Sequence, residues 1–150
     1  MTFADGKYGK PRLIEREWLD VLIRFRNAVY DCVSCPNEEF INDLPAKCSA
    51  CGKPLMIKNQ LRCKKYDMPL FPGVRLLQFQ TGECADRDTL NVVFECKATP
   101  DGRYYVTNTS TDTWRCTNTK GNSVKVPPGE IMPVMTGIKA KIFGTEFKII

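Results

Sequence analysis

The sequence predicts an α+β protein that is mostly β, with a single amphipathic helix near its N-terminal end. Three observations support this class. Apolar residues recur at three- and four-residue steps only between residues 14 and 29. Two Cys-x-x-C pairs follow directly, and beyond residue 68 short β-prone runs alternate with turns. We therefore expect three parts: a helix in 1–30, a cysteine-rich module in 31–68 and an antiparallel β-sandwich in 69–150.

The helix is expected over about residues 13–30. Its apolar stripe consists of Ile14, Trp18, Val21, Leu22, Phe25, Ala28 and Val29. Charged residues occupy the other side, as in an amphipathic surface helix. Such a stripe either packs against the rest of the chain or binds a partner. Because packing is the commoner outcome, we expect a packed stripe.

The cysteine-rich module carries the pairs Cys32/Cys35 and Cys48/Cys51, separated by 12 residues. Each pair can offer two thiolates from one tight turn, and the loop between them can bring the pairs opposite each other. This is the tetrahedral arrangement of a structural zinc site. Gly52 suits a turn that needs a positive φ. Two disulfides or four unrelated thiols are the alternatives, and the spacing favours a zinc ribbon with Zn²⁺ as structural cofactor.

Cysteine content and charge limit the compartment and the partners. Eight cysteines without an apolar N-terminal signal segment indicate a reducing, cytoplasmic setting. No run approaches the roughly 18 apolar residues that span a bilayer, so we expect no membrane partner. The net charge of +5 is spread along the chain, which argues against nucleic acid as partner. The alternative function, a nucleic-acid-binding zinc ribbon, would use a modest basic cluster: Lys58, Arg62, Lys64 and Lys65.

Residues suited to catalysis are scarce. The chain has no histidine, which removes the commonest general base. A zinc ion with four cysteine ligands has no open coordination position, and no Gly-rich phosphate-binding loop occurs. An enzyme with a thiol nucleophile stays open as a third alternative, through Cys63, Cys84 or Cys116. Cys96 lies in an apolar run and is expected to fill the core. We expect a protein that is not an enzyme.

The C-terminal half is predicted to form short strands only. We expect them at Val74–Phe79, Leu90–Lys97, Arg103–Thr107, Thr113–Thr117, Ser123–Val126, Ile131–Val134, Lys139–Phe143 and Glu146–Ile150. The turn Thr99–Gly102 should join two of them as a hairpin, because proline fixes one φ and glycine tolerates a positive φ. Short strands at this spacing are typical of a β-sandwich.

From about residue 75 the chain resembles a forkhead-associated (FHA) domain, a β-sandwich that reads phosphothreonine through its loops. The resemblance rests on Pro128-Gly129-Glu130, Gly137 and a closing hairpin with Ile142, Gly144, Phe147 and Ile149. It implies an FHA-like sandwich with a phosphopeptide or partner site. Where the family has an Asn-Gly pair, this sequence has Asp112-Thr113, whose carboxylate would repel phosphate. The candidate partner-binding residues are therefore Arg87, Arg103, Ser110 and Arg115.

Phe3–Leu22 is similar to the last helices of bacterial eukaryotic-like Ser/Thr kinases, on Pro11-Arg12 and Glu17-Trp18. Together the parts resemble the C-terminal region of a kinase of the tellurite-resistance-associated triad. The resemblance implies a catalytic lobe outside this chain, and a protein or phosphoprotein partner such as a kinase, a phosphatase or a von Willebrand A protein. We therefore expect a non-catalytic regulatory or docking module in phosphosignalling, with phosphothreonine reading as one form.

Overall fold

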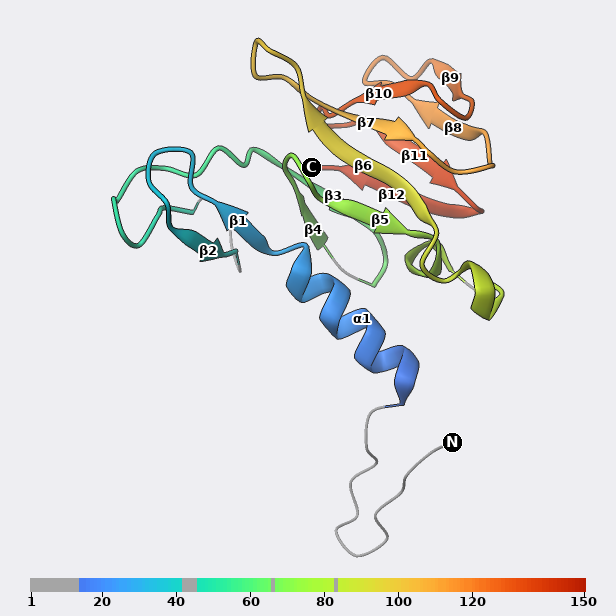
Figure 1. Ribbon diagram of the computed structural model, residues 1–150. Helices are drawn as coiled ribbons and strands as arrows, with labels where there is room; N and C mark the ends of the chain where they lie inside the picture. Colours follow the sequence, from blue (N-terminus) through green and yellow to red (C-terminus); the bar gives the residue numbers. More distant parts are fainter. Residues whose placement is uncertain (1–13, 42–45, 66, 83) are drawn as a thin grey trace, which may run out of the picture.

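The computed structural model describes residues 14–41, 46–65, 67–82 and 84–150 (Figure 1). It is mostly β, with one α-helix and antiparallel sheets, which confirms the predicted class in this coarse form. The elements in chain order are α1 (Glu15–Arg26), β1 (Val29–Asp31), β2 (Glu38–Phe40), β3 (Asn59–Arg62), β4 (Asp67–Leu70), β5 (Arg75–Leu77), the 3₁₀ helices η1 (Gln78–Thr81) and η2 (Asp86–Asp88), β6 (Val92–Ala98), β7 (Tyr104–Asn108), β8 (Trp114–Thr117), β9 (Ser123–Val126), β10 (Ile131–Pro133), β11 (Lys139–Ile142) and β12 (Thr145–Ile149).

Two antiparallel sheets face each other in the C-terminal part (Figure 1). One has four strands in the order β10-β7-β6-β5, and the other has six in the order β4-β3-β12-β11-β8-β9. Phe94 on β6 and Trp114 on β8 meet edge to face between the sheets, with ring centroids 6.1 Å apart, and both are fully buried. Alternate positions on β11 and β12 point inward, so apolar and charged residues alternate along these strands.

The eight strands expected in the C-terminal half are present, with ends shifted by at most two residues. Two ends shift by two residues: β5 ends at Leu77, because Gln78–Thr81 forms η1 instead, and β6 begins at Val92. β11 and β12 meet in a two-residue hairpin turn at Phe143 and Gly144, where both φ angles are positive (45° and 79°). This is the backbone that a type I′ turn requires, and it explains why the hairpin turns so tightly.

The six-stranded sheet begins before the expected domain boundary. β3 pairs with β12, placing Leu61 opposite Ile149, and β4 pairs with β3. Residue 68 lies inside β4, and Leu61 and Met68 are both buried in the common core. Before β3, the segment after the second cysteine pair is joined to the chain before it by a single bridge between Lys47 and Pro54. Local sequence patterns do not reveal β3, since its partner strand lies more than 80 residues away along the chain.

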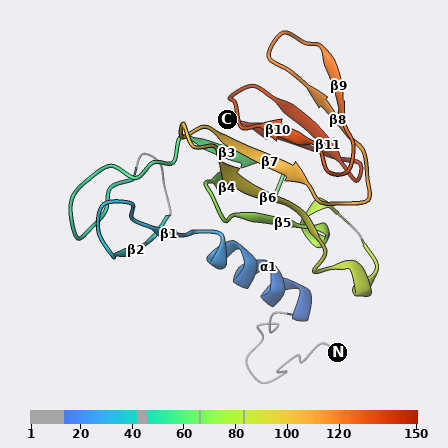
Figure 2. The ribbon, with the colours of Figure 1, turned by 45° about the horizontal axis from the view of Figure 1, so that its top comes forward.

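α1 lies beside β4 and β5 (Figure 2). Its apolar stripe is exposed from Ile14 to Phe25, and only Ala28 and Val29 after the helix are buried or half-buried. Within the helix, Ile23 is the residue buried by packing. The expectation of a packed stripe is wrong for the described residues, since Trp18, Leu22 and Phe25 are 53%, 58% and 57% exposed. At the C-terminal end of the helix the buried Asn27 amide donates to the Arg75 carbonyl oxygen at 2.7 Å, and in its first turn the Arg16 guanidinium donates to the Cys84 carbonyl oxygen at 3.2 Å. These polar contacts do not cover Trp18, Leu22 and Phe25.

Candidate metal centre

The four cysteines of the two pairs lie in tight turns at one end of the molecule. Cys32 directly follows β1, and its N–H donates to the Asn37 carbonyl oxygen at 2.9 Å. In the second turn the Cys48 N–H donates to the Lys53 carbonyl oxygen at 2.9 Å. Gly52 has the positive φ expected of it (72°), and its N–H closes the turn onto the Cys48 carbonyl oxygen at 2.8 Å. Both turns therefore present their sulfurs on one side.

The four sulfur atoms form one group, all within 4.8 Å of one another. The Sγ atoms of Cys32 and Cys51 are 3.8 Å apart, and those of Cys35 and Cys48 are 3.5 Å apart. A tetrahedral zinc site with Zn–S bonds of about 2.3 Å places its sulfurs about 3.8 Å apart. All four cysteines are free, with no disulfide among them, and the cluster is compatible with a metal site. The structure thus brings together the residues that the spacing selected.

The electrostatics of the cluster favour a bound cation. The Ser34 N–H, 3.4 Å from the Cys32 sulfur, lowers the pKa of that thiol to about 7. The Asn37 N–H acts in the same direction on Cys35, but desolvation and hydrogen bonds with the other three thiols outweigh it and raise the pKa of Cys35 to about 12. Four thiolates at these distances repel one another, and a divalent ion among them removes that penalty.

A polar network ties the two cysteine turns together. The Glu39 carboxylate on β2 accepts hydrogen bonds from Asn37 Nδ2 at 2.6 Å and from the Ser49 hydroxyl at 2.7 Å. Hydrogen bonds from the Ser49 side chain and backbone lower the pKa of Glu39. Asn37 Nδ2 also lies 3.7 Å from the Cys48 sulfur. Sequence reasoning missed this network, although Asn37 and Ser49 follow a cysteine by two positions and one position, and polar residues so close to a metal ligand are placed to orient it.

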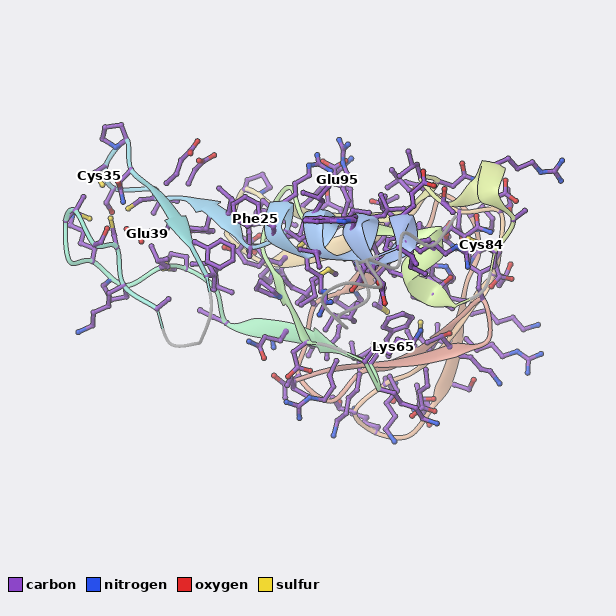
Figure 3. The ribbon with its side chains drawn as sticks, turned by 90° about the horizontal axis from the view of Figure 1, so that it is seen from below. Phe25, Cys35, Glu39, Lys65, Cys84 and Glu95 are labelled. Carbon is purple, nitrogen blue, oxygen red and sulfur yellow. The ribbon has the colours of Figure 1, made fainter. Side chains whose placement is uncertain are left out.

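Figure 3 shows Cys35 and Glu39 at one end of the molecule and Cys84 near the other. The donor set at the Cys35 end consists of four soft thiolates and closes all four positions of a tetrahedral ion. Tetrahedral sulfur sites of this kind take zinc or iron. A closed shell can stabilise the turns but leaves no position for a substrate.

The four candidate partner-binding residues do not converge on one site. Arg87 lies on η2, before β6, and Arg103 lies just after the turn that follows β6. β6 has seven residues, so these two guanidinium groups are at opposite ends of a strand roughly 23 Å long (Figure 1). Arg115 lies on the outer face of β8, away from the core. Arg103 is paired with Asp101 at 2.7 Å.

Ser110 is at the same end of the sandwich as η2, but its hydroxyl is engaged inside the fold. It donates to Asn108 Oδ1 at 2.6 Å and accepts from Trp114 Nε1 at 3.2 Å. Asn108 is completely buried, and its amide donates to the carbonyl oxygens of Asp112 and Val126, both at 2.8 Å. This network anchors the loop between β7 and β8.

Two of the remaining thiols are buried in the sandwich. Burial raises the pKa of Cys96 to about 12 and that of Cys116 to about 11. Both stay protonated near neutral pH, so neither is a ready thiolate nucleophile. Cys63 and Cys84 are half-buried.

In the part of the chain that the structure describes, no helix is long and apolar enough to cross a membrane. No family model, no curated protein and no solved structure matches the chain. The forkhead-associated and kinase resemblances therefore stand as expectations, on the residues that carry them.

Proposed function

We propose that this chain is a non-catalytic protein-docking module of a phosphosignalling system, stabilised by a structural zinc ion on Cys32, Cys35, Cys48 and Cys51. The observation that carries the docking role is the exposed apolar face of α1, formed by Trp18, Val21, Leu22 and Phe25. The signalling context comes from the resemblances in sequence. The two parts of the proposal can be tested separately.

The apolar face of α1 is larger than stability alone explains. Its four side chains are between 43% and 58% exposed, and Phe40 on β2, 47% exposed, stacks on Phe25 with ring centroids 5.1 Å apart. Monomeric proteins rarely expose contiguous apolar patches of this kind unless a partner covers them. A 12-residue helix is also marginal in water without tertiary packing. Both arguments favour a partner on this face.

A groove beside the helix gives the partner a defined place. It has a volume of about 470 Å³ and is lined by Val21, Phe25, Ala28, Phe40, Met68 and Pro69. Most of this lining is apolar, and Arg24 and Asp67 are its charged members. An amphipathic helix of the partner, with apolar residues at three- and four-residue spacing, has the chemistry to fill it.

The zinc ion would act on this surface from a distance. β1 and β2 connect α1 to the cysteine turns, and Phe40 belongs to β2. A metal that fixes the cysteine turns would also fix β2, and with it the stacking of Phe40 on Phe25. The role of zinc in the proposal is therefore to hold the docking face in shape.

The test is crosslinking in cells from a photoreactive phenylalanine at position 22, on the docking face. The control position is 131 on β10, where the isoleucine is 57% exposed and lies away from α1. We expect a discrete adduct with another protein from position 22, reduced at least tenfold by Phe25→Asp, and none from position 131. Equal labelling from both positions, or none from 22, would contradict the docking role.

Whether the docking depends on phosphothreonine is tested on the protein captured in the same adduct. Phosphatase treatment, followed by binding to phosphorylated and unphosphorylated peptides of the captured protein, reports phosphate dependence. Phosphate-dependent binding that Arg115→Gln abolishes would support recognition of phosphothreonine by the candidate residues. Binding indifferent to phosphate would leave docking through α1 alone.

A further inference from the structure

Strand pairing gathers basic residues that lie far apart in the sequence. On the outer face of the six-stranded sheet, Arg62, Lys148 and Lys139 are neighbours on β3, β12 and β11. A second row places Lys141, Arg115 and Lys125 side by side on β11, β8 and β9. Lys64 and Lys65 follow β3 at the edge of the same surface. We call these eight exposed residues the basic face.

The basic face holds most of the charge imbalance of the chain. It contains eight of the 22 basic residues, and among the acidic residues that the structure describes only Asp67 and Glu146 lie between them. Counted over the described residues, its net charge is about +6, which exceeds the +5 of the whole chain. The expectation against nucleic acid was based on charge spread along the sequence. In the fold that charge is concentrated on one side.

The stability of the sheet does not account for this pattern. Arg62 forms a bidentate salt bridge with Asp67, with Nε–Oδ1 and Nη2–Oδ2 distances of 2.8 and 2.7 Å. Among the described residues, no carboxylate lies within 4.0 Å of the side-chain nitrogens of Lys139, Lys141, Lys148, Arg115 or Lys125. Like charges directly opposite each other on paired strands are destabilising. An anionic ligand would offset that repulsion.

A groove continues the basic face around β12. It has a volume of about 760 Å³, and basic side chains from β3, the segment after it, β11 and β12 line it, including Arg62, Lys64, Lys65, Lys141 and Lys148. Figure 3 shows Lys65 beside the C-terminal strands. The positive surface is therefore extended and partly concave, unlike a pocket for one small anion.

We propose that the basic face binds the phosphate backbone of a nucleic-acid duplex without reading its sequence. The five strands β3, β12, β11, β8 and β9 span roughly 20 Å at their usual spacing. A duplex presents about one phosphate charge per 1.7 Å of its axis, so roughly a dozen phosphates face or flank this width. An extended array of cations matches an extended array of anions.

The side chains around the basic face distinguish this occupant from others. Of the described residues that point outward from these strands, none is aromatic, so the stacking that single strands use is missing. None of the exposed large apolar residues points outward there, because Val124 lies opposite Cys116 on the other side of its strand. Polybasic membrane anchors normally add an apolar or lipid anchor to the charge. The proposal is independent of docking through α1, because none of the eight basic residues lines the groove beside the helix; Asp67 borders both surfaces.

The test measures binding of the full chain to a fluorescent 20-base-pair DNA duplex by anisotropy, at several salt concentrations. The test variant is Lys139→Gln/Lys141→Gln/Lys148→Gln, which removes three charges and three like-charge contacts. The matched control, Lys53→Gln/Lys97→Gln/Lys120→Gln, removes three exposed charges outside the basic face. Circular dichroism and metal content confirm that each variant is folded.

We expect the test variant to bind at least tenfold more weakly at low salt, and the control to bind within about twofold of the parent. The slope of log K against log salt should fall in magnitude by about 2.7, since each phosphate contact contributes about 0.9. Equal loss in both variants would overturn the proposal. So would binding of the parent to phosphatidylserine vesicles or polyglutamate but not to the duplex, because the occupant would then be of another class.

Discussion

The cysteine-bearing end and the sandwich are held together by different physical means. The sandwich has large side chains with no exposed surface, among them Trp114, Phe94 and Ile142. The cysteine-bearing end has strands of only three residues, and its buried apolar residues, such as Tyr30 and Ile57, join the core of the sandwich. In its outer turns the side chains that cluster together are four cysteines, not large apolar residues. Segments this small seldom bury enough apolar surface to fold without a metal or disulfides.

The comparison predicts that metal removal unfolds one end and spares the other. Structural zinc contributes about 10–16 kcal/mol to the folding of isolated zinc-finger peptides, so its loss should be the largest single effect in this molecule. Dialysis against a strong chelator should release one zinc ion per chain. Hydrogen exchange should then rise in residues 29–57, while β6, β7, β11 and β12 stay protected.

Tryptophan fluorescence gives an independent measure of the same difference. Trp114 is buried in the sandwich and Trp18 is exposed on α1, so a Trp18→Phe variant reports the sandwich alone. Its emission should not change on chelation. Cys48→Ser should reproduce the effect of the chelator, and Cys63→Ser should not. Absence of zinc, or equal deprotection of both ends, would contradict the distinction.

The attachment of α1 to the sandwich depends on Asn27. This residue is 4% exposed, its amide donates to the Arg75 carbonyl oxygen, and its Oδ1 accepts from the Arg75 N–H at 3.4 Å. Asn27→Ala leaves the partly buried N–H and carbonyl groups of Arg75 without these partners, which should cost about 1 kcal/mol. We expect a loss of that size in the free energy of unfolding by urea, with faster exchange in α1.

A matched substitution distinguishes the effect of losing the Asn27 attachment from the effect of losing any asparagine hydrogen bond. Asn91 is exposed and its amide contacts Asp88 Oδ1 at 3.3 Å. Asn91→Ala should change the free energy of unfolding by less than about 0.5 kcal/mol, as surface substitutions usually do. Similar losses for both variants would mean that Asn27 is not the attachment point of α1.

Local patterns predicted the features that depend on near neighbours. The spacing of Cys32, Cys35, Cys48 and Cys51 selected the sulfur cluster, and alternation with turn residues located the strands from β5 to β12. Each of these signals lies within about 20 consecutive residues of the chain. The forkhead-associated identity of the sandwich and zinc as the metal stay predictions.

The features that sequence reasoning missed depend on distant pairing. β3 pairs with β12 across more than 80 residues, and this pairing alone brings Arg62 next to Lys148. The exposure of the α1 stripe depends on where Asn27 anchors the helix, which no periodicity reveals. Arg87 and Arg103 seemed equivalent in sequence, but β6 holds them at its two ends. A positive face in particular is a property of the register, since its members are scattered from residue 62 to residue 148.

The smallest predicted effect concerns the Arg62–Asp67 pair in the sandwich. It compares what this pair contributes to folding stability with what it contributes to the charge of the basic face. Hydrogen bonds and charge attraction from Arg62 lower the pKa of Asp67. A lowered folded-state pKa means that the pair stabilises the fold above the unfolded value of about 3.9, and that this contribution is lost as pH falls further. Both side chains are more than a third exposed, so Asp67→Asn should cost only about 0.2–1 kcal/mol at pH 7 and nothing near pH 2.

The same substitution should act in the opposite direction on duplex binding. Asp67→Asn removes one of the two carboxylates of the basic face and frees the Arg62 guanidinium for phosphate. We expect the salt slope to grow in magnitude by up to about 0.9, with tighter binding at low salt. Urea unfolding at pH 7 and pH 2, together with anisotropy on the duplex, measures both effects on one protein. If Asp67→Asn lowers stability without tightening duplex binding, the Arg62–Asp67 pair stabilises the sheet only. Arg62 would then not contact phosphate even when its carboxylate partner is removed.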